Sequence, residues 1–161
     1  MKRKIFVTTI LSIAGAVGVA LAATDQVPYP SDYRSWQHVK SMVIQQGHPL
    51  HGSFGGIHHL YANAQAMKGY RSGQFADGSV IAFDLLEAPA ADNAITEGKR
   101  KVLGVMHKDS KLYAATGGWG FEGFAGDSKT ERVVGANAAT ACYGCHTARS
   151  QQGYVFSAYR N

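Results

Sequence analysis

The sequence of 161 residues contains only two cysteines, Cys142 and Cys145, and few charged side chains, 17 % of the total. A disulfide across two intervening residues would close too short a loop to add much stability. A structural zinc site needs four ligands, and there is no second cysteine pair to supply them, although histidines are plentiful. Apolar residues are spread along the whole chain, which excludes a disordered protein.

No stretch after Leu21 is long and apolar enough to span a bilayer. The chain begins with three cations, continues with an apolar run from Ile5 to Leu21 and reaches the small-residue pattern Ala20-Leu21-Ala22. This order is typical of a secretory signal peptide, so we expect residues 1–22 to be removed and the protein to be periplasmic. An uncleaved membrane anchor is the alternative, and it fits less well because polar residues and glycines interrupt the run.

Without the predicted signal peptide, the chain has almost no excess of positive over negative side chains. The formal net charge of +5 includes three cations in residues 1–22, so 13 basic and 11 acidic side chains remain. The resulting charge of +2 does not indicate a nucleic-acid partner. Residues 23–161 are long enough to enclose one hydrophobic core, and we expect them to form a single domain.

The hydrophobic periodicity predicts an α+β fold, a mainly antiparallel sheet with a few short helices. We expect a helix that ends at Gly47, because Tyr33, Trp36, Val39 and Val43 recur at helical spacing. A polar loop is predicted over residues 88–99, and a short helix should carry the two cysteines. The remaining predicted elements are a strand at 55–63, a helix at 64–73, a strand after the Asp77-Gly78 turn and strands within 101–110 and 112–126.

The segment Cys142-Tyr143-Gly144-Cys145-His146 has the C-x-x-C-H pattern of c-type haem attachment. Two thiols three residues apart on a helical turn can reach the two vinyl groups of one porphyrin, and the next residue directs an imidazole at the iron. A thioredoxin-like redox pair is the alternative, but it would open a helix after an early strand of a βαβ unit. The sequence therefore predicts one covalently attached haem c, with Cys142 and Cys145 as anchors and His146 as iron ligand.

The group opposite His146 decides what such a haem does, because a second strong ligand suits electron transfer and an open face suits small-molecule binding. No methionine follows His146, which argues against cytochromes that take a methionine ligand from downstream. Neighbouring histidines on a strand face opposite ways, so at most one of His58 and His59 can point inward. The other upstream candidates for a sixth ligand are Met106, His48, His51 and His107.

With the haem motif placed, the chain resembles the cytochrome P-460 family, which includes the cytochromes c′-beta. The matching segments, in order, are "YRSWQHVK", "IHHLYAN", "YRSGQFADGSVIAFDLLEA", "GVMHKDSKLYAATGGWGFEGF", "CYGCH" and "YVFSAYR". The resemblance implies a small, mainly antiparallel β domain, usually a homodimer, with one five-coordinate c-type haem. A helical-bundle cytochrome c′ is the rival fold, and the alternating segments and glycines disfavour it.

The resemblance also separates two branches of the family. In the cytochrome P-460 branch a strand lysine is joined to the porphyrin, and the protein oxidises hydroxylamine or nitric oxide. In the c′-beta branch the lysine is absent and phenylalanines crowd the distal face, where nitric oxide or carbon monoxide binds. Here Phe83 stands at the lysine position, and no lysine occurs between Lys68 and Lys99. A link from Lys99 or Lys101 would need a different strand.

Phe54 matches the second place where the c′-beta branch has a distal phenylalanine, so we expect Phe54 and Phe83 to line an apolar distal pocket. Such a wall cannot donate a hydrogen bond to bound dioxygen, and nitric oxide and carbon monoxide depend less on one. Four polar residues of the matching segments could still act on a proton, although surface roles are the simpler interpretation: Arg71, Asp84, Glu87 and Glu122. Asp84 alternates away from Phe83 and should not share the pocket.

These observations predict an exported mono-haem cytochrome that binds nitric oxide or a similar small gas and is not primarily an enzyme. The first alternative is an oxidoreductase that acts on hydroxylamine or nitric oxide. The second alternative is an electron-transfer cytochrome with a sixth iron ligand. The expected partners are a small gaseous ligand or small nitrogen compound and a second copy of the chain.

Overall fold

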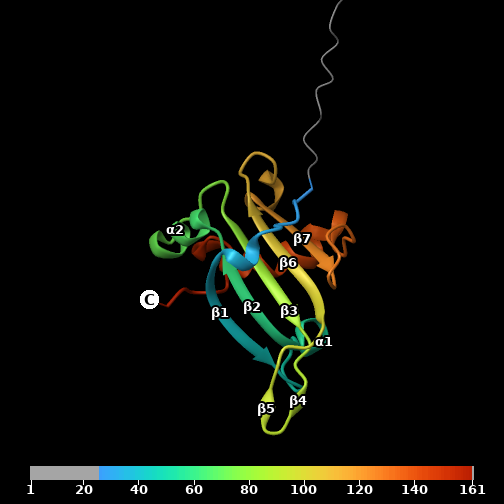
Figure 1. Cartoon of the computed structure of the whole chain (residues 1–161). Helices are drawn as coiled ribbons and strands as arrows, with labels where there is room; N and C mark the ends of the chain where they lie inside the picture. The colour runs from blue at the N-terminus through green and yellow to red at the C-terminus, as the bar shows by residue number, and fades with distance from the viewer. Residues whose placement is uncertain (1–25, 161) are drawn as a thin grey trace, which may run out of the picture.

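A five-stranded antiparallel sheet organises the structure, a computed structural model that describes residues 26–160. Figure 1 shows the strands side by side in a strongly curved sheet, in the spatial order β1-β2-β3-β6-β7. The α+β fold class predicted from the sequence is confirmed. The strands are β1 (Gln37–Ile44), β2 (Gly56–Ala62), β3 (Val80–Leu86), β6 (Arg100–Lys108) and β7 (Trp119–Ala125).

The helical elements are short and lie between or beside the strands. None of those within residues 26–160 has the length and apolar character needed to cross a bilayer. The predicted signal peptide, residues 1–22, lies outside the described residues. The helical elements are η1 (Tyr33–Ser35), α1 (His51–Phe54), α2 (Ala64–Ser72), η2 (Ala114–Thr116), η3 (Gly135–Asn137), η4 (Ala139–Tyr143), α3 (Gly144–His146) and η5 (Thr147–Gln152).

The long first helix predicted from the sequence is wrong. The chain makes one 3-10 turn, η1, and then runs as strand β1, which pairs antiparallel with β2. Val39, Val43 and Ile44 are β-branched, and such side chains lose rotamer freedom in a helix and pack well on a pleated sheet. Pairing with β2 therefore outweighs the helical spacing of the aromatic and apolar residues.

The loop predicted over residues 88–99 contains a small hairpin that the sequence analysis did not anticipate. Its strands are β4 (Ala90–Ala91) and β5 (Ala94–Ile95), and the hairpin projects from the end of the sheet in Figure 1. Asp92 and Asn93 both have positive φ, 54° and 60°. Asp and Asn tolerate this conformation, and two such residues in sequence make the tight turn that a two-residue hairpin requires.

Helix α2 begins and ends where the sequence analysis placed it. The Asn63 side chain caps the first turn by accepting a hydrogen bond from the Ala66 N–H at 2.8 Å. Gly73 ends the helix in the left-handed conformation, with φ of 77°. The Asn63 carboxamide also bonds the Val80 N–H, so one side chain joins the helix to the start of β3.

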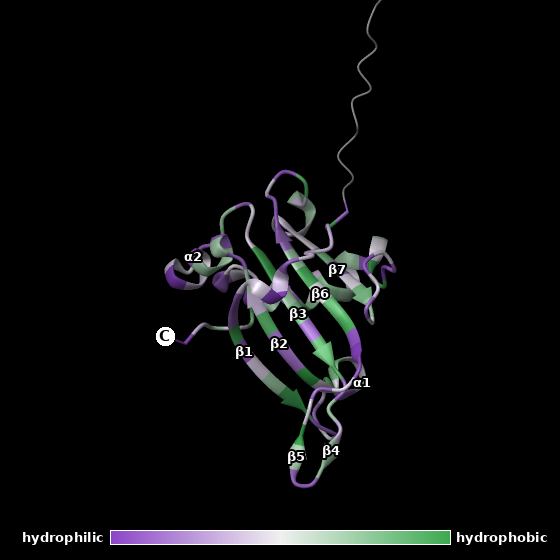
Figure 2. Cartoon of the chain, in the orientation of Figure 1, coloured by the Kyte–Doolittle hydropathy of each residue, from purple (hydrophilic) through white to green (hydrophobic). Residues whose placement is uncertain are grey.

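The sheet has two buried faces, and different ends of the chain cover them. We call the face that packs against residues 138–155 the C-terminal face, and the face that packs against residues 27–36 the N-terminal face. Figure 1 shows the last segment behind the sheet and the first segment in front of it. The strands β3 and β6, which have neighbours on both sides, are largely hydrophobic in Figure 2. Burial on both faces explains that composition.

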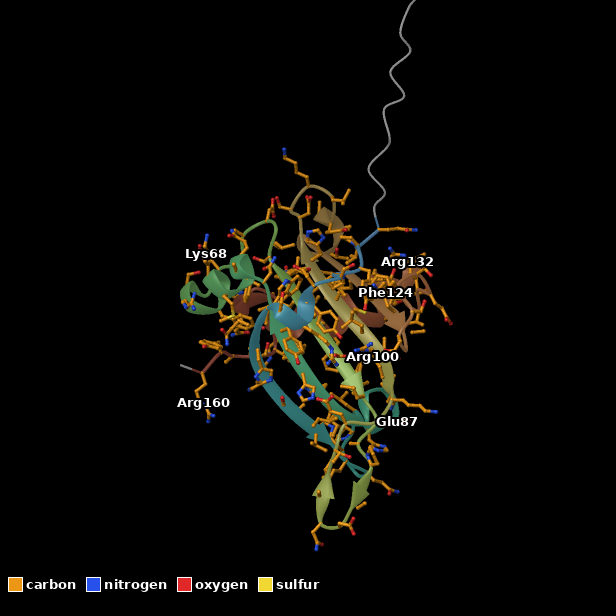
Figure 3. The ribbon with its side chains drawn as sticks, in the orientation of Figure 1. Lys68, Glu87, Arg100, Phe124, Arg132 and Arg160 are labelled. Carbon is orange, nitrogen blue, oxygen red and sulfur yellow. The ribbon has the colours of Figure 1, made fainter. Side chains whose placement is uncertain are left out.

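An ionic cluster on the N-terminal face ties the first segment to the sheet. The Asp84 carboxylate, 0 % exposed, accepts hydrogen bonds from Arg100 Nε at 2.6 Å and Tyr33 Oη at 2.7 Å. Figure 3 shows Arg100 on β6. Burial alone would raise the pKa of Asp84, but these hydrogen bonds and the charges of Arg100 and Arg34 outweigh it and hold the pKa below its usual range.

Candidate functional site

The two cysteines lie on consecutive helical turns at the C-terminal face of the sheet. Cys142 is in the π-helical turn η4, half-buried, and Cys145 is in α3, exposed. Their thiols are free. Because residues three apart on a helix lie on the same side, both thiols are available to one neighbouring group. Burial raises the pKa of the Cys142 thiol, so it is protonated at neutral pH.

His146 is oriented by the backbone of the segment that follows it. Its Nδ1 atom lies 2.6 Å from the carbonyl oxygen of Tyr154, and a carbonyl only accepts, so Nδ1 carries the proton. The lone pair is then on Nε2, the atom that binds a metal when Nδ1 is hydrogen-bonded. Burial lowers the pKa of His146, which keeps the imidazole neutral.

Residues 153–154 hold the Tyr154 carbonyl in place through two consecutive left-handed conformations. Gly153 has φ of 65° and Tyr154 has φ of 67°, a conformation that an L side chain adopts at a cost. The indole N–H of Trp119, 0 % exposed, donates to the Gly153 carbonyl at 2.9 Å. A Cβ at Gly117 would lie 2.5 Å from Tyr154 Cζ, so only glycine there leaves space for the Tyr154 ring.

Aromatic rings surround the His146 imidazole. The Phe121 ring centroid is 5.0 Å from it and the Phe156 centroid is 5.1 Å away. Phe121 lies on β7 and is packed in the C-terminal core, whereas Phe156 comes from the end of the chain and is exposed. The imidazole is therefore enclosed by apolar surface on the sheet side.

Phe54 and Phe83, which the sequence analysis placed in one pocket, are in contact. Their ring centroids are 5.8 Å apart at an interplanar angle of 82°, an edge-to-face arrangement. Phe83 is on the C-terminal face of β3 and lies over Gly104 of β6, where an added Cβ would be 3.4 Å from Phe83 Cδ1. Phe54 is the last residue of α1 and is 39 % exposed.

Lys101 fixes the end of the short helix that carries Phe54. Its ammonium group donates a hydrogen bond of 2.6 Å to the carbonyl oxygen of Gly55, the residue after α1. A cation is favourable at a helix C-terminus, where carbonyl groups lack partners within the helix. Lys101, one of the two alternative cross-linking lysines, is thus engaged with backbone.

His58 is a further neighbour of Phe83. The two ring centroids are 4.6 Å apart at 35°, and His58 is 5 % exposed. Its Nδ1 atom is buried without a hydrogen-bond partner. Burial, together with the nearby His59 and Lys40, lowers the pKa of His58 to about 4, so the ring is neutral at pH 7. His59 faces the opposite way, with Nε2 2.8 Å from Glu97 Oε1, as the strand alternation predicted.

The other sequence candidates are distributed over both faces. Met106 packs against the C-terminal core between Ile81 and Phe121 in the strand register, so it shares the face of Phe83. His48 precedes α1 and His51 is its first residue, and both are exposed. Asp84 faces away from Phe83, as expected, but it is buried in the ionic cluster and is not a surface group. Nowhere in residues 26–160 do three His, Cys, Asp or Glu side chains gather as a metal site of their own.

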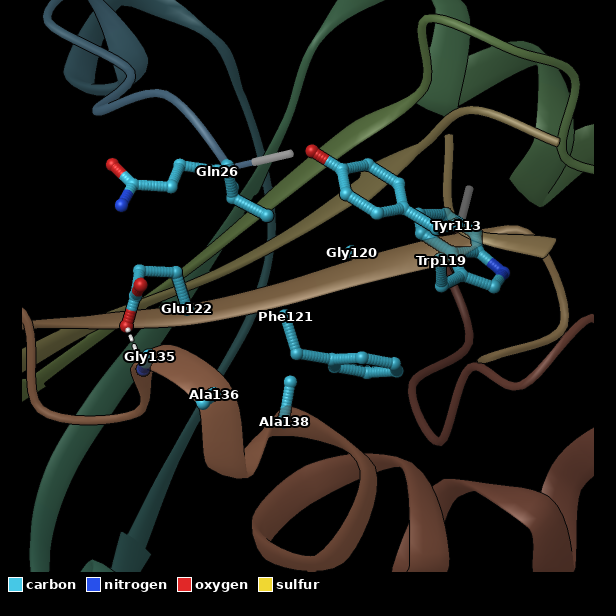
Figure 4. A pocket seen from close by; sticks show the side chains of 10 residues that line it. Gln26, Tyr113, Trp119, Gly120, Phe121, Glu122, Gly135, Ala136 and Ala138 are labelled. Atoms are coloured by element: carbon cyan, nitrogen blue, oxygen red, sulfur yellow. Dashed lines mark hydrogen bonds between the residues drawn. The ribbon is translucent and has the colours of Figure 1, made fainter. Parts of the chain in front are cut away.

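Glu122 secures the segment that leads to the cysteines. Its carboxylate accepts hydrogen bonds from the Val134 and Gly135 N–H groups, both at 3.1 Å, and from Arg132 Nη1 at 3.0 Å. Burial alone would raise the pKa of Glu122, but these bonds and one from the Gly123 N–H hold it below its usual range. Figure 4 shows Glu122 and Gly135 on the wall of a cavity of about 270 Å³ beside β7, with Phe121 and Ala138 next to each other.

On the C-terminal face, His146 and the phenylalanine pair lie apart from each other across the sheet. Phe121, beside His146, and Phe83 are separated by two strand spacings and one two-residue step, roughly 12 Å between Cα atoms. Gly104 of β6 is paired with Phe83, and Gly123 of β7 is paired with Gly104, so the two positions next to Phe83 across the sheet carry no side chain. The imidazole with a free Nε2, the apolar surroundings and the unpaired His58 nitrogen fit a haem on this face.

Fold and site together define a haem-binding cytochrome built on an antiparallel sheet. The sequence matches the family described as Cytochrome P460 over residues 30–157. The chain belongs to the cytochrome P460 family. No curated protein matches the sequence.

The residues that orient His146 could not be predicted from the sequence. Tyr154 and Gly153 act through carbonyl oxygens, which every residue has, so no side-chain pattern marks them. Trp119 is buried in the C-terminal core, and its N–H contact to Gly153 depends on tertiary structure. Tyr154 has a positive φ, but a tyrosine in a sequence does not indicate a left-handed conformation. A glycine at that position would indicate one.

Proposed function

We propose that this protein is an exported c-type cytochrome of the c′-beta branch, with one haem whose distal face is open to nitric oxide or a similar small gas. The observation that carries the proposal is the contact between Phe54 and Phe83 on the C-terminal face, with a phenylalanine at the cross-linking position. The free Cys142 and Cys145 thiols and the His146 imidazole are the other parts.

Cys142 and Cys145 are the proposed covalent anchors. Each thiol would add across one vinyl group of the porphyrin, forming one C–S bond while the thiol proton goes to the other vinyl carbon. No oxidant is consumed, because the addition is redox-neutral. Cys142, Cys145 and His146 lie on one short segment, and Glu122 binds the backbone of Val134 and Gly135, which precede that segment.

His146 is the proposed iron ligand through Nε2. The hydrogen bond from Nδ1 to the Tyr154 carbonyl selects this tautomer and increases the basicity of the ligating nitrogen. When bound, haem iron supplies a site for small diatomic ligands and for one-electron redox chemistry. Phe121 and Phe156 restrict the orientation of the imidazole ring.

Phe54 and Phe83 are the proposed distal wall. The two rings pack edge to face, and Phe83 leans over Gly104, so the pair excludes bulky ligands and discourages water. Nitric oxide and carbon monoxide bind haem iron without needing a hydrogen-bond donor, so two phenylalanine rings at the distal face are compatible with both gases. The expected cross-linking lysine is absent from β3, and Lys101 is directed to Gly55.

Two observations favour the alternatives. His58 is a buried nitrogen base beside Phe83, which an oxidoreductase acting on hydroxylamine or nitric oxide could use. Met106 is a soft ligand on the same face, which an electron-transfer cytochrome could use as a sixth ligand. We further propose export by residues 1–22 to the periplasm and assembly as a homodimer.

The test is a titration of the purified, haem-loaded protein with nitric oxide and carbon monoxide, followed by absorption spectroscopy. We expect both gases to bind the ferrous protein stoichiometrically, with little reduction of an added electron acceptor by hydroxylamine. Substantial hydroxylamine-dependent turnover would favour the oxidoreductase. Failure of either gas to bind would contradict an open distal face.

A further inference from the structure

His58 is the most deeply buried polar side chain on the C-terminal face near the phenylalanine pair. It is 5 % exposed, and Nδ1 has no hydrogen-bond partner within the described residues. An unpaired polar atom in a protein interior costs about 1–3 kcal/mol, so such atoms are uncommon and generally meet a water, an ion or a ligand. The position of this atom therefore points to a missing polar partner.

The strand register places His58 on the same face as Phe83. His58 pairs with Leu85 of β3, and Leu85 and Phe83 are two residues apart, so their side chains project to the same side of the sheet. The ring stacking of His58 on Phe83 at 4.6 Å agrees with this register. His59, its neighbour in sequence, bonds Ser41 and lies against Glu97 on the other face.

The surroundings of His58 keep its imidazole ring neutral and offer it no hydrogen-bond partner in the paired strand positions. Burial disfavours the imidazolium, and the nearby charges come from Lys40 and His59, which also disfavour it. Opposite it in β1 is Met42, and opposite it in β3 is Leu85, neither of which is a hydrogen-bonding group of any strength. The ring is therefore neutral and holds one N–H, with no side chain in its paired positions to receive it.

We propose that His58 is the distal hydrogen-bond donor, in the tautomer that carries the proton on Nδ1, and that it bonds the small ligand held against Phe54 and Phe83. This inference rests on the proposed function, since it requires a haem with an open face on this side of the sheet. It changes the distal wall from purely apolar to apolar with one directed polar group. Phe83, which touches both His58 and Phe54, sets the position of that group.

The proposal makes His58 a specificity residue for ligands that accept a hydrogen bond. Fluoride on ferric haem is such a ligand, and carbon monoxide on ferrous haem reports the same donor through its stretching frequency. A nearby N–H favours electron density on the carbon monoxide oxygen, which weakens the C–O bond and lowers that frequency. The two probes examine both oxidation states without requiring turnover.

The experiment compares the haem-loaded wild type with His58→Leu, His58→Gln and His59→Leu. In His58→Leu we expect the fluoride dissociation constant to rise roughly 5- to 10-fold, because one hydrogen bond is lost. We also expect the C–O stretch to move to higher frequency. His58→Gln supplies an amide N–H and should recover part of both effects. His59→Leu removes a histidine from the opposite face and should change neither.

Folding is checked separately by thermal unfolding of each variant. Leucine replaces an unpaired polar side chain with an apolar one, so His58→Leu should unfold at a temperature no lower than that of the wild type. If wild type binds both probes and His58→Leu binds them with unchanged affinity and frequency, the assignment of His58 is overturned while the open haem face stands. If wild type binds neither probe, the open face and the inference both fail.

Discussion

The Nδ1 atom of His146 donates a hydrogen bond of 2.6 Å to the carbonyl oxygen of Tyr154, eight residues along the chain. Tyr154 has φ of 67°, and the preceding carbonyl, that of Gly153, accepts the indole N–H of Trp119. A buried side chain of β7 therefore positions the backbone that orients the imidazole. This connection links the sheet to the proposed iron ligand.

Replacing Trp119 with phenylalanine tests this connection. Trp119→Phe keeps an aromatic ring but leaves the Gly153 carbonyl without its donor, which should lower the free energy of unfolding by about 1–3 kcal/mol. A less well-oriented Tyr154 carbonyl should weaken the bond from His146 and make the ligand less basic, so the haem midpoint potential should become more positive. Urea unfolding and redox titration measure the two effects.

Trp36 provides the matched control. Its Nε1–H donates to Asp32 at 3.2 Å in an exposed contact, so Trp36→Phe should change stability by less than about 0.5 kcal/mol and leave the potential unchanged. Equal shifts of the potential in both variants would show that Trp119 has no particular influence on His146.

The buried carboxylate of Asp84 should make stability depend on acid pH. Its pKa is held below the ordinary value of 3.8, so the unfolded chain takes up the proton more readily than the folded one. The stabilisation is present in full above the unfolded pKa and is lost as pH falls through the folded pKa. Asp84→Asn removes the buried charge partner of Arg100 and leaves only the exposed Asp127, so it should cost about 3–5 kcal/mol at neutral pH.

Unfolding of wild type and Asp84→Asn at a series of pH values measures this dependence. The difference between them should shrink as pH falls below about 3.8, the ordinary carboxyl value. Asp127→Asn is the control, because Asp127 also pairs with Arg100 but its side chain is 86 % exposed, and its removal should cost at most about 1 kcal/mol. A constant difference between wild type and Asp84→Asn at all pH values would contradict the account of the cluster.

The cysteine anchors are tested by removing them singly and together. Cys142→Ala and Cys145→Ala should each keep haem on the denatured chain through the remaining thioether, and the double variant should release it. Haem staining of denaturing gels measures this directly. Cys142→Ala should also be the less stable single variant, because Cys142 packs against the C-terminal core and Cys145 is exposed. Haem retained by the denatured double variant would show a different attachment.

Truncation of Phe83 should open the distal side. Phe83→Ala removes the ring that Phe54 and His58 contact, so the haem-loaded protein should bind a bulky ligand such as imidazole at least tenfold more tightly. Its cost in stability should fall below the about 3–5 kcal/mol of a fully buried phenylalanine, because Phe83 is only partly buried. Spectroscopic titration with imidazole gives the affinity.

Phe156→Ala is the control for this titration, since Phe156 contacts His146 on the proximal side. It should leave the affinity for imidazole close to the wild-type value. If Phe156→Ala and Phe83→Ala changed that affinity equally, Phe83 would not be a distal residue.

The sequence predicted those parts of the structure that local pattern determines. The turn at Asp77-Gly78, strand β3 with its alternation and a helix over residues 64–73 that ends at a glycine were expected and are present. Strand β1 was not expected, because its apolar residues match helical spacing and only the pairing with β2 selects a strand. Whether His58 or His59 faces inward likewise depends on register, which alternation alone leaves open.

Some residues of the candidate site could likewise be predicted from the sequence, and others could not. The cysteines and His146 are recognisable from their spacing, and the pairing of Phe54 with Phe83 was expected only from the family resemblance. Lys101 on the Gly55 carbonyl, Trp119 on the Gly153 carbonyl and His146 on the Tyr154 carbonyl were not expected. Their acceptors are backbone atoms, whose positions depend on tertiary structure and not on residue type.

The coordination state of the haem in the purified wild-type protein tests the central claim most directly, through resonance Raman and absorption spectra of the ferric and ferrous forms. An open distal face bounded by Phe54 and Phe83, with His146 as the axial ligand, predicts a five-coordinate, high-spin iron in both forms and a Soret band typical of an unmodified haem c. A six-coordinate, low-spin spectrum would contradict the open face. A strongly red-shifted Soret band would contradict the absence of a porphyrin cross-link.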